Sequence, residues 1–122
     1  MSNIPSDKDF ARAKRLAMER AKNIGAINEA VMKQFHGSSP LHYFILMPQR
    51  DNEFWAGVFY EKESDISVCE TNGLTRVIQD FVYSELERQG RGGKDEVNVV
   101  FEIDSDEHVN AKYGGDYFLR LR

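Results

Sequence analysis

The chain has 122 residues, a length typical of a single domain with one core. Sixteen basic and 20 acidic residues give a formal charge of −4, which argues against broad binding to the phosphate backbone of nucleic acids, because that binding needs a basic face. The single cysteine excludes an intrachain disulfide, and no apolar run approaches the ~18 residues of a membrane span. The first residues lack the basic and apolar regions of a signal peptide, so we expect a cytoplasmic protein.

A helical region is predicted from Ser6 to about His36. Ser6 and Asp9 form an S-x-x-D pattern close to a capping box. Apolar residues then recur at three- and four-residue steps, as on one face of a helix. Gly25 is expected to end this helix or bend it. The segment Gly37-Ser38-Ser39-Pro40 stops the helical region, because proline lacks an amide donor and disfavours a helical residue before it.

The middle of the chain is strand-like. The run Leu41–Met47 is almost entirely apolar and rich in β-forming residues. Pro48–Asn52 is interpreted as a hairpin connection to a partner strand, Glu53–Tyr60. A polar turn at Glu61–Asp65 is then followed by a short third strand at Ile66–Glu70, predicted to lie at an edge. Sequential hairpins imply antiparallel pairing.

The second half begins with the clearest helix, which Asn72 and Gly73 open and which presents one apolar stripe. A glycine-rich loop at 89–94 leads to a strand at Glu96–Ile103, whose alternate residues from Val97 to Ile103 share one face. The tail follows with three predicted segments: an acidic turn at Asp104–His108, one helical turn at Val109–Tyr113 and an extended piece at Asp116–Arg122.

This order of elements predicts one α+β domain spanning residues 1–122. Helices that are separated in sequence from a run of strands are typical of that class. We expect two layers: an antiparallel sheet of about four to five strands, with the N-terminal helices and one central helix packed on one face.

Two features invite a catalytic interpretation, and neither is favoured. Cys69 lies between Val68 and Glu70, with no histidine pattern that would supply a base and lower its pKa, so we interpret it as a small strand residue. The glycine-rich loop at 89–94 follows a helix and precedes a strand. A phosphate-binding loop has the reverse context, following a strand and opening a helix. We predict no catalytic residues.

A metal site is considered at the acidic turn. His108 lies beside Asp104, Asp106 and Glu107, and this run superficially resembles a calcium loop. However, the sixth position of such a loop would be Val109 instead of glycine, and the twelfth would be Gly115 instead of glutamate. We therefore predict no metal ligands and no cofactor. The three histidines show no ligand spacing.

Carboxylates are concentrated in the loops, where they are either ordinary solvated groups or a binding face for a basic protein. Complementary charge would raise the rate of association, and a few aromatic residues would supply affinity. Trp55 and Tyr60 are two aromatic candidates. The candidate partner-binding residues are Glu61, Glu63, Asp65, Asp104, Asp106, Glu107, Tyr113, Asp116 and Tyr117.

The C-terminal segment carries a family resemblance. A strand that ends in Phe101-Glu102-Ile103-Asp104-Ser105 is followed by Gly115-Asp116-Tyr117 and the residues up to Arg122. This arrangement resembles the end of small bacterial toxin-immunity proteins, including YezG-like ones and those paired with contact-dependent growth-inhibition toxins. The likeness covers about the last 22 residues. Asp116, Tyr117 and Arg120 also have a structural interpretation, in which Arg120 pairs with a buried carboxylate.

The resemblance implies a non-enzymatic protein that binds a cognate toxin C-terminal domain, often a nuclease, and blocks its active site or substrate access. From the charge and the lack of a long apolar run we expect no nucleic-acid or membrane partner, and we expect a monomer or a weak homodimer. Two alternatives remain open. One is an adaptor that binds a peptide along an exposed strand edge such as Ile66–Glu70. The other is a metal-dependent hydrolase using Asp104, Asp106, Glu107 and His108.

Overall fold

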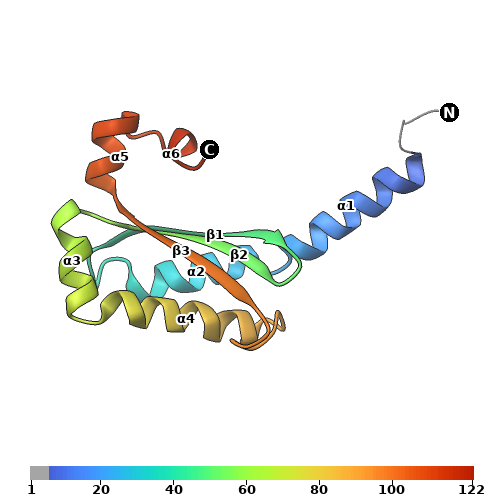
Figure 1. Ribbon diagram of the computed structural model, residues 1–122, viewed down its shortest axis with the longest axis horizontal. Coiled ribbons are helices and arrows are strands. Elements are labelled where there is room, and N and C mark those ends of the chain that lie inside the picture. The colour runs from blue at the N-terminus through green and yellow to red at the C-terminus, as the bar shows by residue number, and fades with distance from the viewer. Residues whose placement is uncertain (1–5) are drawn as a thin grey trace.

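The computed structural model describes residues 6–122, and in this part of the chain it contains six helices and three strands (Figure 1). Their order and bounds are α1 (Asp7–Ala21), α2 (Ile24–Phe35), β1 (Leu41–Arg50), β2 (Glu53–Tyr60), α3 (Glu63–Thr71), α4 (Leu74–Arg88), β3 (Asn98–Ser105), α5 (Asp106–Tyr113) and α6 (Tyr117–Arg120). The α+β class predicted from the sequence is confirmed.

The N-terminal helices begin with the predicted capping box. The Ser6 hydroxyl accepts a hydrogen bond from the Asp9 amide at 3.3 Å, and the Asp9 carboxylate accepts one from the Ser6 amide at 3.1 Å. The break between α1 and α2 lies at Asn23, which has φ +66°, and not at Gly25, which lies within α2. No residue of α1 is buried, and the helix extends away from the rest of the molecule (Figure 1).

The predicted hairpin is confirmed in β1 and β2, which pair antiparallel. The connection is shorter than predicted, since β1 continues through Pro48 to Arg50 and the turn has Asn52 at φ +62°. A proline is tolerated there because β1 lies at the edge of the sheet, where one side of a strand has no partner.

The predicted third strand at Ile66–Glu70 is wrong, because this segment belongs to α3. Ile66 and Cys69, three residues apart, face the core, while Val68 is 55% exposed. The short alternation of apolar and polar residues therefore fitted a helix as well as a strand. The polar turn at Glu61–Asp65 supplies the first turn of α3, where Asp65 accepts a hydrogen bond from the Lys62 amide at 2.9 Å.

The sheet has three strands in the order β1-β2-β3, and β3 runs parallel to β2. The predicted antiparallel sheet of four to five strands is therefore wrong. Since α3 and α4 connect β2 to β3, the chain crosses over and enters the sheet again in the same direction. The register runs from Glu53 opposite Asn98 to Tyr60 opposite Ser105, so β2 and β3 end side by side.

The core lies between one face of the sheet and the helices α2 and α4, as Figure 1 shows. The prediction that the N-terminal helices and one central helix pack on one face is confirmed for α2 and α4 but not for α1, which buries no residue. Val97 and Val99 are buried and Phe101 and Ile103 pack against the core, so the predicted shared face is also confirmed. The strand residues in this core are Leu41, Phe44, Leu46, Phe54, Ala56, Val58, Tyr60 and Val99.

We call the other side of the sheet the open face. Because side chains alternate along a strand, it carries the residues between the core positions: Tyr43, Ile45, Met47, Trp55, Gly57, Phe59, Val100, Glu102 and Asp104. The helices α5 and α6 lie on this side (Figure 1). The ring of Tyr117 contacts Tyr43 and Phe59, with centroids 5.2 and 5.1 Å apart, and Phe59 is buried.

The tail is more helical than predicted. The helical turn at Val109–Tyr113 is confirmed but begins three residues earlier, where the Ser105 hydroxyl caps α5 by accepting from the His108 amide at 3.0 Å. The extended piece at Asp116–Arg122 is wrong, because Asp116 caps the short helix α6 by accepting from the Leu119 amide.

Candidate functional site

The C-terminal ends of β2 and β3 meet the first turns of α3 and α5 at one end of the open face. Five of the predicted partner-binding carboxylates gather here, and we call this group the acidic end: Glu61, Glu63, Asp104, Asp106 and Glu107. Parallel pairing of β2 with β3 produces this meeting, because it brings residues 60 and 105 side by side.

Asp104 and Arg120 form the most enclosed ion pair of the group. The Arg120 Nε donates to Asp104 Oδ2 at 2.6 Å, and its Nη2 donates to Glu102 Oε1 at 2.5 Å. The side chains of Asp104 and Arg120 are only 9% and 13% exposed. The structural interpretation of Arg120, pairing with a buried carboxylate, is therefore confirmed.

The protonation of Asp104 follows from its contacts. Burial acts to raise the pKa of this carboxyl, but hydrogen bonds from Arg120, the Ser105 amide and His108 outweigh burial and lower the pKa below its ordinary value. The His108 Nδ1 lies 2.8 Å from Asp104 Oδ1. Asp104 is thus an ionised group held inside the fold, facing Arg120 and His108.

His42, from the beginning of β1, lies between two other carboxylates. Its Nδ1 is 3.1 Å from Glu61 Oε1, and its Nε2 is 3.4 Å from Asp106 Oδ1. The Tyr117 hydroxyl donates to Asp106 Oδ1 at 2.6 Å, and the Tyr117 ring stacks on His42 with centroids 6.3 Å apart. Burial and the neighbouring Asp106 carboxylate raise the pKa of this hydroxyl. His42, Glu61 and Asp106 are the one group of potential metal ligands found among residues 6–122.

The remaining carboxylates of the acidic end connect α3 to α5. Glu63 accepts a hydrogen bond from the Ser105 hydroxyl at 2.8 Å, and Glu107 accepts one from the Glu63 amide at 3.2 Å. Both carboxylates lie in the first turn of a helix, where the helix dipole favours negative charge. The acidic end is therefore ordered by internal contacts while Glu61, Glu63 and Glu107 stay exposed.

Three predicted partner-binding residues have other surroundings. Asp65 and Asp116 cap α3 and α6. Tyr113 contacts the ring of His108 at 6.1 Å between centroids. The four residues of the hydrolase alternative also separate: Asp104 pairs with His108, whereas Asp106 contacts His42 and Glu107 contacts the backbone of α3.

An apolar groove on the open face adjoins the acidic end and was not predicted from the sequence. It has a volume of about 440 Å³ and lies between β1 and α6. Phe118 is 82% exposed at its border. The run Leu41–Met47 could have indicated the groove. Because it is apolar at successive positions, it places apolar side chains on both faces of the sheet, although helices were predicted to cover only one face. The lining of the groove includes Tyr43, Ile45, Met47, Tyr117, Phe118 and Leu121.

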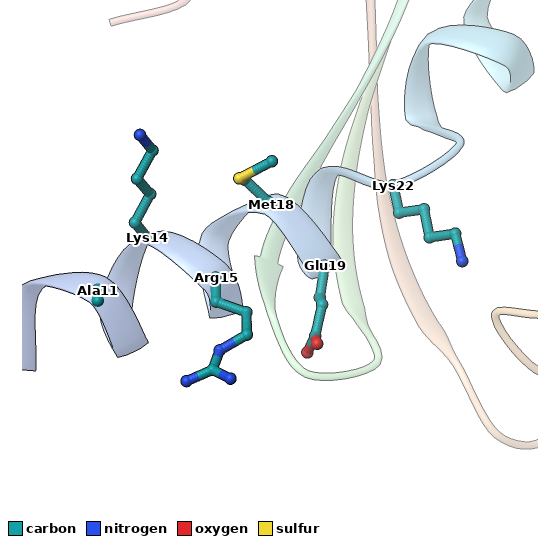
Figure 2. Close-up of a pocket in the computed structure, with 6 residues that line it drawn as sticks. All are labelled: Ala11, Lys14, Arg15, Met18, Glu19 and Lys22. Carbon is teal, nitrogen blue, oxygen red and sulfur yellow. The ribbon is translucent and has the colours of Figure 1, made fainter. Parts of the chain in front are cut away.

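A second hollow, of about 500 Å³, lies on α1 and is a weaker candidate. Figure 2 shows that its lining side chains all come from α1 and the residue after it, so no second element forms an opposite wall. Lys14 and Arg15 extend in different directions from the helix (Figure 2). This hollow is a surface between the side chains of Ala11, Lys14, Arg15, Met18, Glu19 and Lys22.

Cys69 is a buried helix residue instead of the predicted strand residue. Burial and the nearby charge of Asp65 raise the pKa of the thiol above its ordinary value. A nucleophilic cysteine needs a lowered pKa, so its surroundings disfavour that role.

Comparisons with protein-family models, with curated proteins and with solved structures found no match. Among the described residues, no helix has the length and apolar character needed to cross a membrane.

Proposed function

We propose that this chain is a cytoplasmic immunity protein that neutralises a toxin domain by binding it, without catalysis of its own. The observation that carries the proposal is the apolar groove with its exposed Phe118 beside the ordered acidic end. Both lie in or against the C-terminal segment that resembles immunity proteins.

The chemistry of this surface suits a basic partner. Glu61, Glu63 and Glu107 are exposed and would attract the basic substrate cleft of a nuclease toxin. The groove offers tyrosine and aliphatic side chains, and buried aromatic anchors supply much of the affinity in protein interfaces. Bound in this way, the chain would cover the cleft and exclude the substrate.

Co-expression with a candidate toxin domain from a neighbouring gene tests the function. We expect cell survival and recovery of a one-to-one complex. Death of the cells, with no complex formed by the purified proteins, would overturn the proposal.

A matched pair of variants tests the surface. Phe118→Ser removes an 82% exposed ring beside the groove, and Phe10→Ser removes a 60% exposed ring on the distant α1. We expect Phe118→Ser to weaken toxin binding by at least about tenfold and Phe10→Ser to leave it unchanged. The reverse pattern would place the interface on α1.

The adaptor alternative keeps one supporting observation. The proposed edge at Ile66–Glu70 is helical, but among residues 6–122 β1 has a strand neighbour on one side only. An extended peptide could pair there. Such a peptide would bind through its backbone, so replacing Phe118 would leave its affinity unchanged.

A further inference from the structure

We propose that His42, Glu61 and Asp106 form a binding site for one Zn²⁺ ion, a property that goes beyond toxin binding. One ligand atom from each side chain can be chosen so that all three lie within 4.8 Å of one another. They come from β1, from the residue after β2 and from the first residue of α5. The fold therefore assembles the group from positions far apart in sequence.

The donor set fits a borderline transition metal. One imidazole nitrogen and two carboxylate oxygens leave a fourth position for water, as in zinc sites with three protein ligands. Ligand atoms around tetrahedral Zn²⁺ with bonds of ~2.1 Å are about 3.4 Å apart. The His42 Nδ1 lies 3.1 Å from Glu61 Oε1, whereas its Nε2 lies 3.4 Å from Asp106 Oδ1. Zinc binding therefore requires the side chains to rotate until one ring nitrogen faces both oxygens, starting from ligand atoms within 4.8 Å of one another.

Tyr117 supplies the outer contacts that such sites use. Its hydroxyl donates to the same Asp106 oxygen that faces His42, which fixes the orientation of that carboxylate. Its ring stacks on the imidazole. The side chains of His42, Glu61 and Asp106 are 35%, 48% and 22% exposed, so an ion can reach them from solvent.

The neighbouring histidine lacks these properties. His108 contacts Asp104, but Arg120 donates to the same carboxylate, and its fixed positive charge opposes a second cation. His108 is therefore a matched control for His42.

Titration with Zn²⁺ tests the site in the full chain. We compare the melting temperature with and without ZnCl₂ and record the visible absorption of bound Co²⁺, which reports coordination directly. For the wild type we expect one equivalent bound, a higher melting temperature and Co²⁺ bands. For His42→Gln and Asp106→Asn we expect folded proteins whose metal affinity falls at least about tenfold. His108→Gln should retain the wild-type response.

Three outcomes would overturn the proposal. One is a wild type without Co²⁺ bands or a melting shift, which would leave His42 as a partner of two carboxylates only. Another is a His42→Gln protein that responds like the wild type. The third is an equal melting shift with Mg²⁺, which would indicate general screening of acidic groups instead of imidazole coordination.

Discussion

Asp104 carries its charge at a position where the surrounding protein excludes most water. Desolvation of an ion is costly, and the cost is offset only when partners satisfy its oxygen atoms. Arg120, His108 and the Ser105 amide do so here, with Arg120 contributing both to Asp104 and to Glu102. At the residue scale, this pairing fastens α6 to β3.

Arg120→Ala should destabilise the fold by about 3 kcal/mol, because it leaves the Asp104 carboxylate buried without its strongest partner. Urea unfolding measures the change. Arg122→Ala removes the same kind of side chain from an exposed position and should cost less than about 0.5 kcal/mol. Equal effects of the two substitutions would contradict a structural role of the pair.

Acid should weaken the contribution of Asp104. Its pKa is lowered in the folded state, so between that pKa and the ordinary value of about 3.9 the unfolded state binds more protons. Stability from this group is complete above about pH 5 and is lost as the pH falls through the folded-state pKa. We expect the stability difference between the wild type and Asp104→Asn to shrink from about pH 5 to about pH 2. A difference that is constant over this range would refute the linkage.

At the scale of elements, β2 depends on a glycine at its centre. A Cβ at Gly57 would lie 2.8 Å from Phe59 Cε2 and 2.9 Å from Trp55 Cη2. The absence of a side chain lets the two neighbouring rings close over the strand on the open face. This packing places Phe59 in contact with the ring of Tyr117 and so helps to position Tyr117 in the candidate site.

Gly57→Ala should therefore destabilise the protein by about 1–3 kcal/mol and shift the emission of Trp55, the single tryptophan. Gly25→Ala is the matched control, because an added Cβ there meets nothing within 4 Å. Since Gly25 is the second residue of α2, this substitution should not destabilise the protein and should stabilise it by at most about 0.5 kcal/mol. Loss of stability in both variants, or in neither, would show that packing of the two rings does not explain the need for glycine at position 57.

The elements with long periodic patterns were predictable. The capping box at Ser6, the hairpin of β1 and β2 and the helix opened by Gly73 follow from local sequence and were confirmed. The segment Ile66–Glu70 was not, because five residues do not separate a helical from a strand period. Without a strand at Ile66–Glu70, α3 and α4 together connect β2 to β3, and β3 pairs parallel to β2 instead of antiparallel as predicted.

The candidate site was only partly predictable, because local sequence shows the residues but not their contacts. Its carboxylates were visible as loop residues, but the partners of each carboxylate depend on the strand register. Nothing in the local sequence links His42 to Asp106, or Asp104 to Arg120. We predicted that Arg120 pairs with a buried carboxylate. Which carboxylate it pairs with could not be predicted without knowledge of the parallel sheet.

At the scale of the whole molecule, charge is unevenly distributed. Helix α1 carries five basic and three acidic side chains, although the formal charge of the chain is −4. The remaining residues therefore carry a net charge of −6. Since α1 extends away from α5 and α6, the molecule has a basic end and an acidic end (Figure 1).

Under the proposed function, this asymmetry should make association with a basic toxin domain sensitive to salt. Raising the salt concentration from 0.01 M to 1 M shortens the screening length from ~30 Å to ~3 Å, and we expect the association rate to fall about tenfold. Stopped-flow fluorescence measures the rate. Glu107→Lys changes the acidic end, whereas Glu53→Lys makes the same change at the beginning of β2, away from the acidic end. We expect Glu107→Lys to slow association more than Glu53→Lys. A rate independent of salt would show that the acidic end does not guide the encounter.

The crossover between β2 and β3 also has a consequence for the order of folding. The β1–β2 hairpin joins residues close in sequence, whereas β3 can pair only after the chain has closed a loop that contains α3 and α4. We therefore expect the hairpin to form early and β3 to add late. His42 and Glu61 lie in or next to the hairpin that forms early, whereas Asp106 and Tyr117 follow β3, which adds late. The candidate site then exists only once the last strand is in place, so a binding partner that recognises it distinguishes finished molecules from partly folded ones.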